Sequence, residues 1–293
     1  MAFQSISPER HQLAEGPFWC DRSRTLYWVD IPAHKIWSWR YGTDRYEQWR
    51  MPEKVSAVFT TDIADTLVVV LASRVARFDT VTETLTDVCM LDEDRPNNRG
   101  NDAKVAPDGS LWVGTMDDKE EQACGRLWRI TADGKKTMLL DNVGIANTFA
   151  WDEDRQCMYF ADSMKGQIHR YPYPLFKDVR DQAPFAVAQQ GSGPDGSALD
   201  DDKALWNAQW DGQRIVRYLS DGTIERVLEL PFKRPTSCTF GGPNRKTLFI
   251  TSASVGLESQ LAEQPLAGHV VAIETDVSGP PSQPFRLTNK TGQ

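Results

Sequence analysis

One structural unit recurs six times along this chain of 293 residues, and this repetition is the strongest constraint on its fold. Each unit has an apolar strand, a polar turn rich in Asp, Gly or Asn, an aromatic-rich second strand and a short third strand. The first apolar residues of the second strands lie 41 to 47 residues apart, at Leu26, Leu67, Leu111, Met158, Leu205 and Leu248. Repeats of about 40–50 residues built from short strands are typical of β-propeller blades.

The composition of the repeats favours strands over helices. The segments alternate and are rich in Val, Ile, Tyr and Trp, as strands are. Turns such as Pro107-Asp108-Gly109 supply the residue types that tight turns need. We therefore predict an all-β, six-bladed β-propeller that forms a single domain over 1–293. The stretch 254–268 interrupts the last repeat and is predicted to be a rim loop or a short helix.

Charge and cysteine content narrow the class of protein. The net charge is −8, and Lys and Arg are scattered rather than clustered. This pattern argues against nucleic acid and anionic membranes as partners. Five Cys without a C-x-x-C pair indicate free thiols rather than a zinc cluster. The polar N-terminus does not resemble a signal peptide, and the longest apolar run, 67–72, is too short to span a membrane. We interpret the chain as cytoplasmic, and its oligomeric state stays open.

Four polar segments stand immediately before the expected innermost strands, at equivalent places in their repeats. They are 13–17, 97–102, 144–148 and 193–197. Each alone also fits a polar loop at the mouth of the channel, since Gly and Pro commonly mark turns. Together they would converge on the propeller axis and bring Glu15, Asn147 and Asp195 to one spot. Two carboxylates and an amide oxygen suit a divalent cation. Ca²⁺ is the first choice, with Mg²⁺, Mn²⁺, Zn²⁺ or Fe²⁺ as alternatives.

Five short motifs in these segments and after them carry a family resemblance. They are Glu15-Gly16-Pro17, Arg99-Gly100-Asn101-Asp102, Gly114-Thr115-Met116, Asn147 after Ile-Ala, and Pro194-Asp195-Gly196. In this order, on six matching repeats, they resemble the gluconolactonase/regucalcin (senescence marker protein) family over about 13–287. The amino-acid sequences of 98–101 and 265–268 most resemble those of the family's bacterial sugar-lactonase branch. The resemblance implies a six-bladed propeller with one divalent metal ion in the channel.

The resemblance also implies roles for individual residues. Glu15, Asn147 and Asp195 match the family's metal ligands, and Asp195 matches its general base. Arg99 and Asn101 match residues that contact the substrate. A further acidic substrate contact follows Gly-Thr-Met in some members. An ungapped alignment places Lys119 there, whereas a small shift places Glu120 or Glu121 there, and we assign it to Glu120. Thr148-Phe149 replaces the family's usual small apolar pair.

The expected activity is metal-dependent hydrolysis of a sugar lactone, an aldonolactone, to the aldonic acid. In this hypothesis the metal polarises the carbonyl and Asp195 activates water. The residues leave two alternatives open: a calcium-binding regulatory propeller without turnover, and a related propeller esterase. A protein-interaction scaffold of the WD-repeat kind is disfavoured, because the repeats lack the Gly-His and Trp-Asp dipeptides. The sequence does not identify the sugar.

Overall fold

The structure is a computed structural model that describes residues 3–287, and in this range 24 strands form six antiparallel sheets. Blade 1 contains β2 (Ala14–Cys20), β3 (Thr25–Asp30), β4 (Lys35–Arg40) and β5 (Tyr46–Arg50). Blade 2 contains β6 (Val55–Thr60), β7 (Thr66–Leu71), β8 (Arg74–Asp79) and β9 (Leu85–Met90). Blade 3 contains β10 (Asn98–Val105), β11 (Leu111–Asp117), β12 (Gly125–Ile130) and β13 (Lys136–Val143).

The remaining three blades follow the same order. Blade 4 contains β14 (Ala146–Asp152), β15 (Cys157–Asp162), β16 (Gln167–Pro172) and β17 (Ala186–Val187), with the short 3₁₀ helix η1 (Ser163–Lys165) after β15. Blade 5 contains β18 (Gly193–Leu199), β19 (Leu205–Trp210), β20 (Arg214–Tyr218) and β21 (Ile224–Glu229). Blade 6 contains β22 (Pro235–Gly241), β23 (Thr247–Ser252), β24 (Val271–Glu274) and β1 (Gln4–Ser5).

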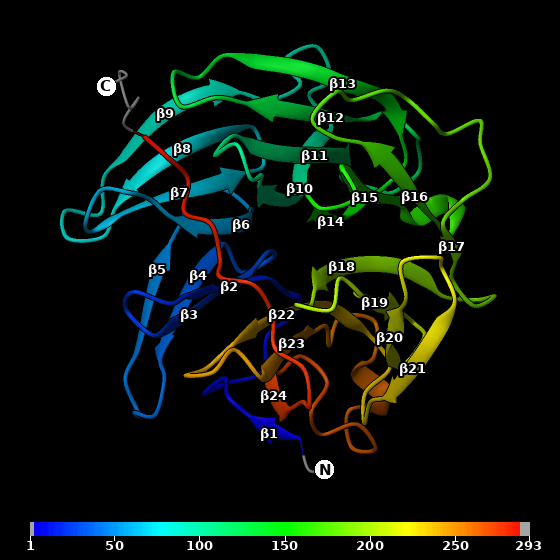
Figure 1. Ribbon diagram of the computed structural model, residues 1–293. Helices are drawn as coiled ribbons and strands as arrows, with labels where there is room; N and C mark the ends of the chain where they lie inside the picture. Colours follow the sequence, from blue (N-terminus) through cyan, green and yellow to red (C-terminus); the bar gives the residue numbers. More distant parts are fainter. Residues whose placement is uncertain (1–2, 288–293) are drawn as a thin grey trace.

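The six sheets stand around a central axis, and this arrangement confirms the predicted six-bladed propeller (Figure 1). The first strands of neighbouring blades contact one another in a closed ring of β2, β6, β10, β14, β18 and β22. All six apolar residues used to count the repeats lie at the first or second position of the second strand of a blade. The sequence period therefore locates each blade correctly.

The last blade is closed by the start of the chain, which the repeat pattern does not predict. Strand β1 pairs antiparallel with β24, with Gln4 opposite Ala272 and Ser5 opposite Val271. Strand β1 is thus the fourth and outermost strand of this sheet, whereas the predicted repeat had only three clear strands. A two-residue edge strand pairs through its backbone and needs no apolar alternation, so it leaves little trace in the sequence.

The hydrophobic core lies between adjacent blades. One apolar cluster joins Phe18 of β2, Phe59 of β6 and Val105 of β10. The rings of Phe18 and Phe59 pack edge to face, with 5.4 Å between their centroids. Full burial of one such side chain stabilises the fold by about 1.5–3 kcal/mol. Because each sheet buries both faces against its neighbours, the innermost strands are held rigidly around the channel.

Two segments outside the regular repeat close the ends of the molecule. The insertion between β23 and β24 contains the 3₁₀ helix η2 (Glu258–Gln260), as predicted for 254–268. After β24, the C-terminal segment 275–287 crosses the propeller face, past β22 and β2 towards blade 2 (Figure 1). Phe285 is fully buried, and its N–H donates to Thr60 O at 2.9 Å.

Two further sequence predictions concern cysteines and membranes. All five Cys residues carry free thiols, as predicted. Within 3–287, no helix has both the length and the apolar character needed to cross a membrane.

Candidate active site in the propeller channel

All six innermost strands carry a β-bulge at an equivalent position. In β2, β10, β14 and β18, two residues oppose a single residue of the second strand. These pairs are Gly16-Pro17, Asn101-Asp102, Thr148-Phe149 and Asp195-Gly196. The bulges of β6 and β22 leave one extra residue unpaired. A bulge interrupts the ladder and re-aims the neighbouring side chains, and such irregularities are frequent beside active sites. The predicted polar segments run into the innermost strands rather than ending before them. Asp195 occupies a bulge, whereas Glu15 and Asn147 lie directly before one.

The three predicted metal ligands come from different blades: Glu15 from β2, Asn147 from β14 and Asp195 from β18. All three side chains are buried. Asn147 Nδ2 donates to Ser163 Oγ at 2.8 Å, and Ser163 Oγ donates to Pro194 O at 2.6 Å. These bonds join the start of β14 to the start of β18. The bulged residue Thr148, at φ 61°, donates from Oγ1 to Asp195 O at 2.5 Å.

Three carboxyl groups interact in this buried cluster. Burial, then the charge of Asp102, raises the pKa of Glu15 to about 8. Burial raises the pKa of Asp102 to about 6, although nearby Lys104 opposes the shift. Burial, then the charges of Glu15 and Asp102, raises the pKa of Asp195 well above its ordinary value. Desolvation and like-charge repulsion both penalise the ionised carboxylates. A cation among them would relieve both penalties.

The donor set fits a hard divalent cation. Glu15 and Asp195 provide carboxylate oxygens and Asn147 provides an amide oxygen, which together suit Ca²⁺ and similar cations. Across 3–287, no group of three or more His, Cys, Asp or Glu side chains is arranged to hold a metal ion. The amide oxygen of Asn147 stays the predicted third ligand beside Glu15 and Asp195.

Arg99 and Asn101 connect by hydrogen bonds to Asn147, one of the predicted metal ligands. The buried Arg99 donates from Nη1 to Gly100 O at 3.0 Å and to Asn101 Oδ1 at 2.8 Å. Asn101 Nδ2 in turn donates to Ala146 O at 3.0 Å and to Asn147 Oδ1 at 3.1 Å. The predicted substrate contacts and one predicted metal ligand thus belong to one hydrogen-bonded chain.

The loop after Met116 lies at the edge of the site. Asp117 Oδ2 accepts hydrogen bonds from the N–H groups of Glu121 and Gln122, and these bonds fold the loop into a tight turn. Glu120 is exposed and lies at φ 60°. Its charge contributes to the raised pKa of Asp195 and opposes the lowering of the Arg99 pKa by burial. Glu120 therefore interacts electrostatically with Asp195 and Arg99, and its role as a substrate contact stays a prediction.

Two acidic residues near the site were missed from the sequence. Asp102 belongs to the carboxylate cluster, and Asp118 forms an ion pair with Arg99 Nε at 3.0 Å. Asp102 follows directly after Asn101 in a polar segment already singled out, and this position was the usable sequence signal. Asp118 has no comparable signal, because the loop that carries it has no regular period.

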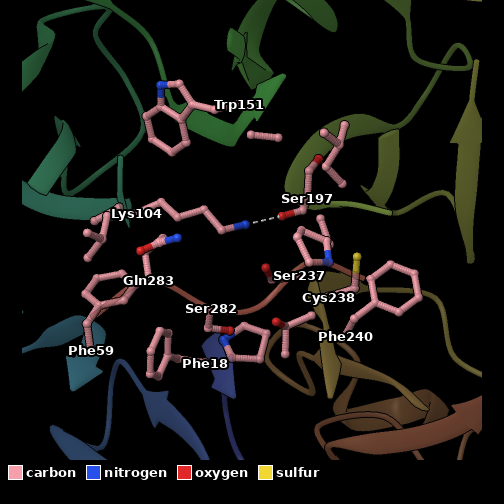
Figure 2. Close-up of a pocket in the computed structure, with 18 of the residues that line it drawn as sticks. Phe18, Phe59, Lys104, Trp151, Ser197, Ser237, Cys238, Phe240, Ser282 and Gln283 are labelled. Carbon is pink, nitrogen blue, oxygen red and sulfur yellow. Dashed lines mark hydrogen bonds between the residues drawn. The ribbon is translucent and has the colours of Figure 1, made fainter. Parts of the chain in front are cut away.

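A cavity of about 190 Å³ lies in the channel beside Asp102, lined by residues of the innermost strands and by the C-terminal segment. Figure 2 shows the aromatic rings of Phe18, Phe59 and Trp151 around it. Lys104 extends across the cavity and donates from Nζ to Ser197 O at 2.7 Å (Figure 2). The C-terminal segment lines this cavity through Pro280, Pro281, Ser282 and Gln283, and Asp102 of the carboxylate cluster lines it as well.

Comparison with known protein families tests the resemblance drawn from the sequence motifs. Residues 13–254 match the family model described as "SMP-30/Gluconolactonase/LRE-like region". The chain belongs to this family. The resemblance drawn from its short motifs is thereby confirmed.

Individual relatives cover nearly the whole chain. An L-arabinolactonase of Azospirillum brasilense is 36% identical over 279 residues, covering 94% of this chain and 92% of the relative. Regucalcin of Gallus gallus is 30% identical over 293 residues, covering 96% and 97%. The crystal structure of a calcium-binding regucalcin from Agrobacterium tumefaciens has a TM-score of 0.89, with 28% identity and 98% of both chains covered. The similarity to L-arabinolactonase agrees with the bacterial sugar-lactonase branch of the family.

Proposed function

We propose that this protein hydrolyses a sugar lactone to the corresponding aldonic acid with the help of one divalent cation. The observation that carries the proposal is the buried, mutually interacting cluster of Glu15, Asp102 and Asp195. Beside it, a hydrogen-bonded chain joins Arg99, Asn101 and Asn147. Membership of a family of sugar lactonases supports it, as does similarity to a protein named L-arabinolactonase.

In this proposal Glu15, Asp195 and the Asn147 amide oxygen hold the cation. The bound cation would supply Lewis acidity at the lactone carbonyl and balance the negative charge that develops on its oxygen. Two carboxylates would neutralise its charge. The Ser163 hydroxyl orients the Asn147 amide by accepting a hydrogen bond from Nδ2, which directs Oδ1 away from that contact.

Asp195 acts as the general base in this mechanism. It takes a proton from water while the water oxygen forms a bond to the carbonyl carbon. The ring C–O bond then breaks, and the ring oxygen takes the proton from Asp195 to become a hydroxyl. A base works best when its pKa lies near the working pH. Burial and the neighbouring carboxylates raise the pKa of Asp195, and a cation would lower it again.

Arg99 and Asn101 orient the substrate. Their hydrogen bonds to one another and to the start of β14 hold them in fixed positions. Groups fixed in this way can bind the sugar hydroxyls without a further loss of side-chain entropy, which is how positioning contributes to rate.

The test is hydrolysis of L-arabinono-1,4-lactone and D-glucono-1,5-lactone, followed with a pH indicator in metal-free protein and after adding Ca²⁺, Mn²⁺ or Zn²⁺. We expect turnover only with metal and a loss of about 10²–10⁴-fold in Asp195→Asn, the usual contribution of a general base. Asp154→Asn serves as the control, because Asp154 is exposed.

Metal binding without turnover in the wild-type protein would favour a regulatory calcium-binding propeller. Turnover of aryl esters but not of lactones would favour a related esterase. Full activity of Asp195→Asn, or of the metal-free protein, would contradict the mechanism.

A further inference from the structure

Asp118 lies between two cations from different blades. Its Oδ1 lies 3.0 Å from Arg99 Nε, and its Oδ1 and Oδ2 accept from Lys54 Nζ at 2.6 and 2.7 Å. Lys54 precedes β6 of blade 2, whereas Arg99 and Asp118 belong to blade 3. The Asp118 carboxylate therefore connects Lys54 of blade 2 to the buried guanidinium of Arg99 in blade 3.

The contacts of Arg99 determine which of its N–H groups can meet a ligand. Nε faces Asp118, and Nη1 donates to Gly100 O and Asn101 Oδ1. Among the described residues, Nη2 makes no hydrogen bond, in contrast to Nη1. A guanidinium is a rigid planar fork, so fixing Nε and Nη1 also fixes the direction of Nη2.

We propose that Asp118, held by Lys54, positions Arg99 so that its Nη2 group binds the hydroxyls of the substrate. The Asp118–Arg99 pair thereby sets the preference for hydroxylated lactones over lactones without hydroxyl groups. The proposal rests on the proposed lactonase function. It assigns the acidic role in the loop after Met116 to Asp118, acting through Arg99 rather than on the substrate itself.

The exposure of the three side chains supports a positioning role. The Arg99 side chain is 9% exposed, whereas those of Asp118 and Lys54 are 40% and 35% exposed. An exposed Lys–Asp pair alone contributes little to stability. Here the Lys54–Asp118 pair acts on the guanidinium of Arg99, which has few other partners because it is buried.

The experiment compares L-arabinono-1,4-lactone with γ-butyrolactone, which has the same ring and no hydroxyl groups. In metal-loaded protein, we expect Asp118→Ala to lower kcat/KM for arabinonolactone about tenfold more than for γ-butyrolactone, mostly through KM. Residues that share one ion-pair network couple by this order of magnitude. Lys54→Met should change the selectivity in the same direction, by about threefold. The double variant should lose no more of this selectivity than Asp118→Ala alone.

Asp154→Ala and Lys203→Met are the matched controls, because they break another Lys–Asp pair, with an N···O distance of 3.3 Å, at a different place. Neither should change the selectivity. Equal losses on both lactones in Asp118→Ala would show a merely structural role and overturn the proposal. Additive losses in the double variant would also overturn it.

A second measurement separates this proposal from the lactonase function. The Arg99 Nε–H signal in a ¹⁵N arginine spectrum, assigned by its loss in Arg99→Lys, should shift in Asp118→Ala and stay unchanged in Asp154→Ala. If the wild-type protein hydrolyses no lactone, the proposed function fails and this signal alone decides the positioning. An unchanged signal in Asp118→Ala would refute it.

Discussion

The buried carboxylate cluster predicts that the metal-free protein loses stability as the pH rises. A carboxyl group whose pKa is higher in the folded than in the unfolded state keeps its proton longer when the chain is folded. The resulting stabilisation is complete below the unfolded pKa and is lost as the pH rises through the folded pKa. For Glu15 this window runs from 4.5 to about 8, and for Asp102 from 3.8 to about 6.

The size of the effect follows from the Glu15 shift. Each pH unit over which the folded state holds one extra proton changes the free energy of unfolding by about 1.4 kcal/mol. The rise in the Glu15 pKa from 4.5 to about 8 therefore corresponds to at most about 5 kcal/mol. Asp102 and Asp195 titrate in the same cluster, so their shifts are not added separately.

Urea unfolding of the chelator-treated protein between pH 5 and pH 8.5 measures this loss. Glu15→Gln should flatten the decline, because the amide has no proton to lose, whereas the exposed Glu229→Gln should not. Adding Ca²⁺ at about 100 times its Kd should restore about 2.7 kcal/mol at high pH in the wild type and less in Glu15→Gln. Metal-free stability that stays constant or rises over this range would refute the reasoning.

Two further predictions concern residues that support the site. Asp92 accepts hydrogen bonds from Trp128 Nε1 at 2.8 Å and from Thr115 Oγ1 at 2.6 Å, so Asp92→Ala should cost about 3 kcal/mol by leaving buried donors unpaired, measured by urea unfolding at pH 7. An unchanged unfolding midpoint would contradict this. Phe285→Ala should cost about 3–5 kcal/mol, because its fully buried ring anchors the C-terminal segment against blades 2 and 3. Faster proteolysis near the C-terminus should accompany that loss, and wild-type protease resistance would argue against the anchoring role.

The blades could be predicted because their signal is local and repeated. The apolar residue that opens each second strand, such as Leu111, recurs because every blade must bury the same strand between its neighbours. Closure of the last blade by β1 could not be predicted in this way. Its partner β24 lies at the other end of the chain, and two backbone pairs need no particular side chains.

The candidate site divides in the same manner. Glu15, Asn147 and Asp195 stand out in the sequence because polar residues interrupt equivalent positions of apolar strands. Asp118 does not stand out, because it meets Arg99 only after the loop has folded around Asp117 and Lys54 has approached from the neighbouring blade.

The sequence by itself thus determined the number of blades, the strands that line the channel and the family of the chain. These depend on short-range alternation and on motifs that can be read residue by residue. Only the tertiary structure placed Asp102 with Glu15 and Asp195, connected Asp118 to Arg99, and brought the C-terminal segment across one end of the channel. These contacts depend on the closed ring of bulged strands, on the loop after β11 and on the path of the C-terminal segment, none of which follows from short-range patterns in the sequence.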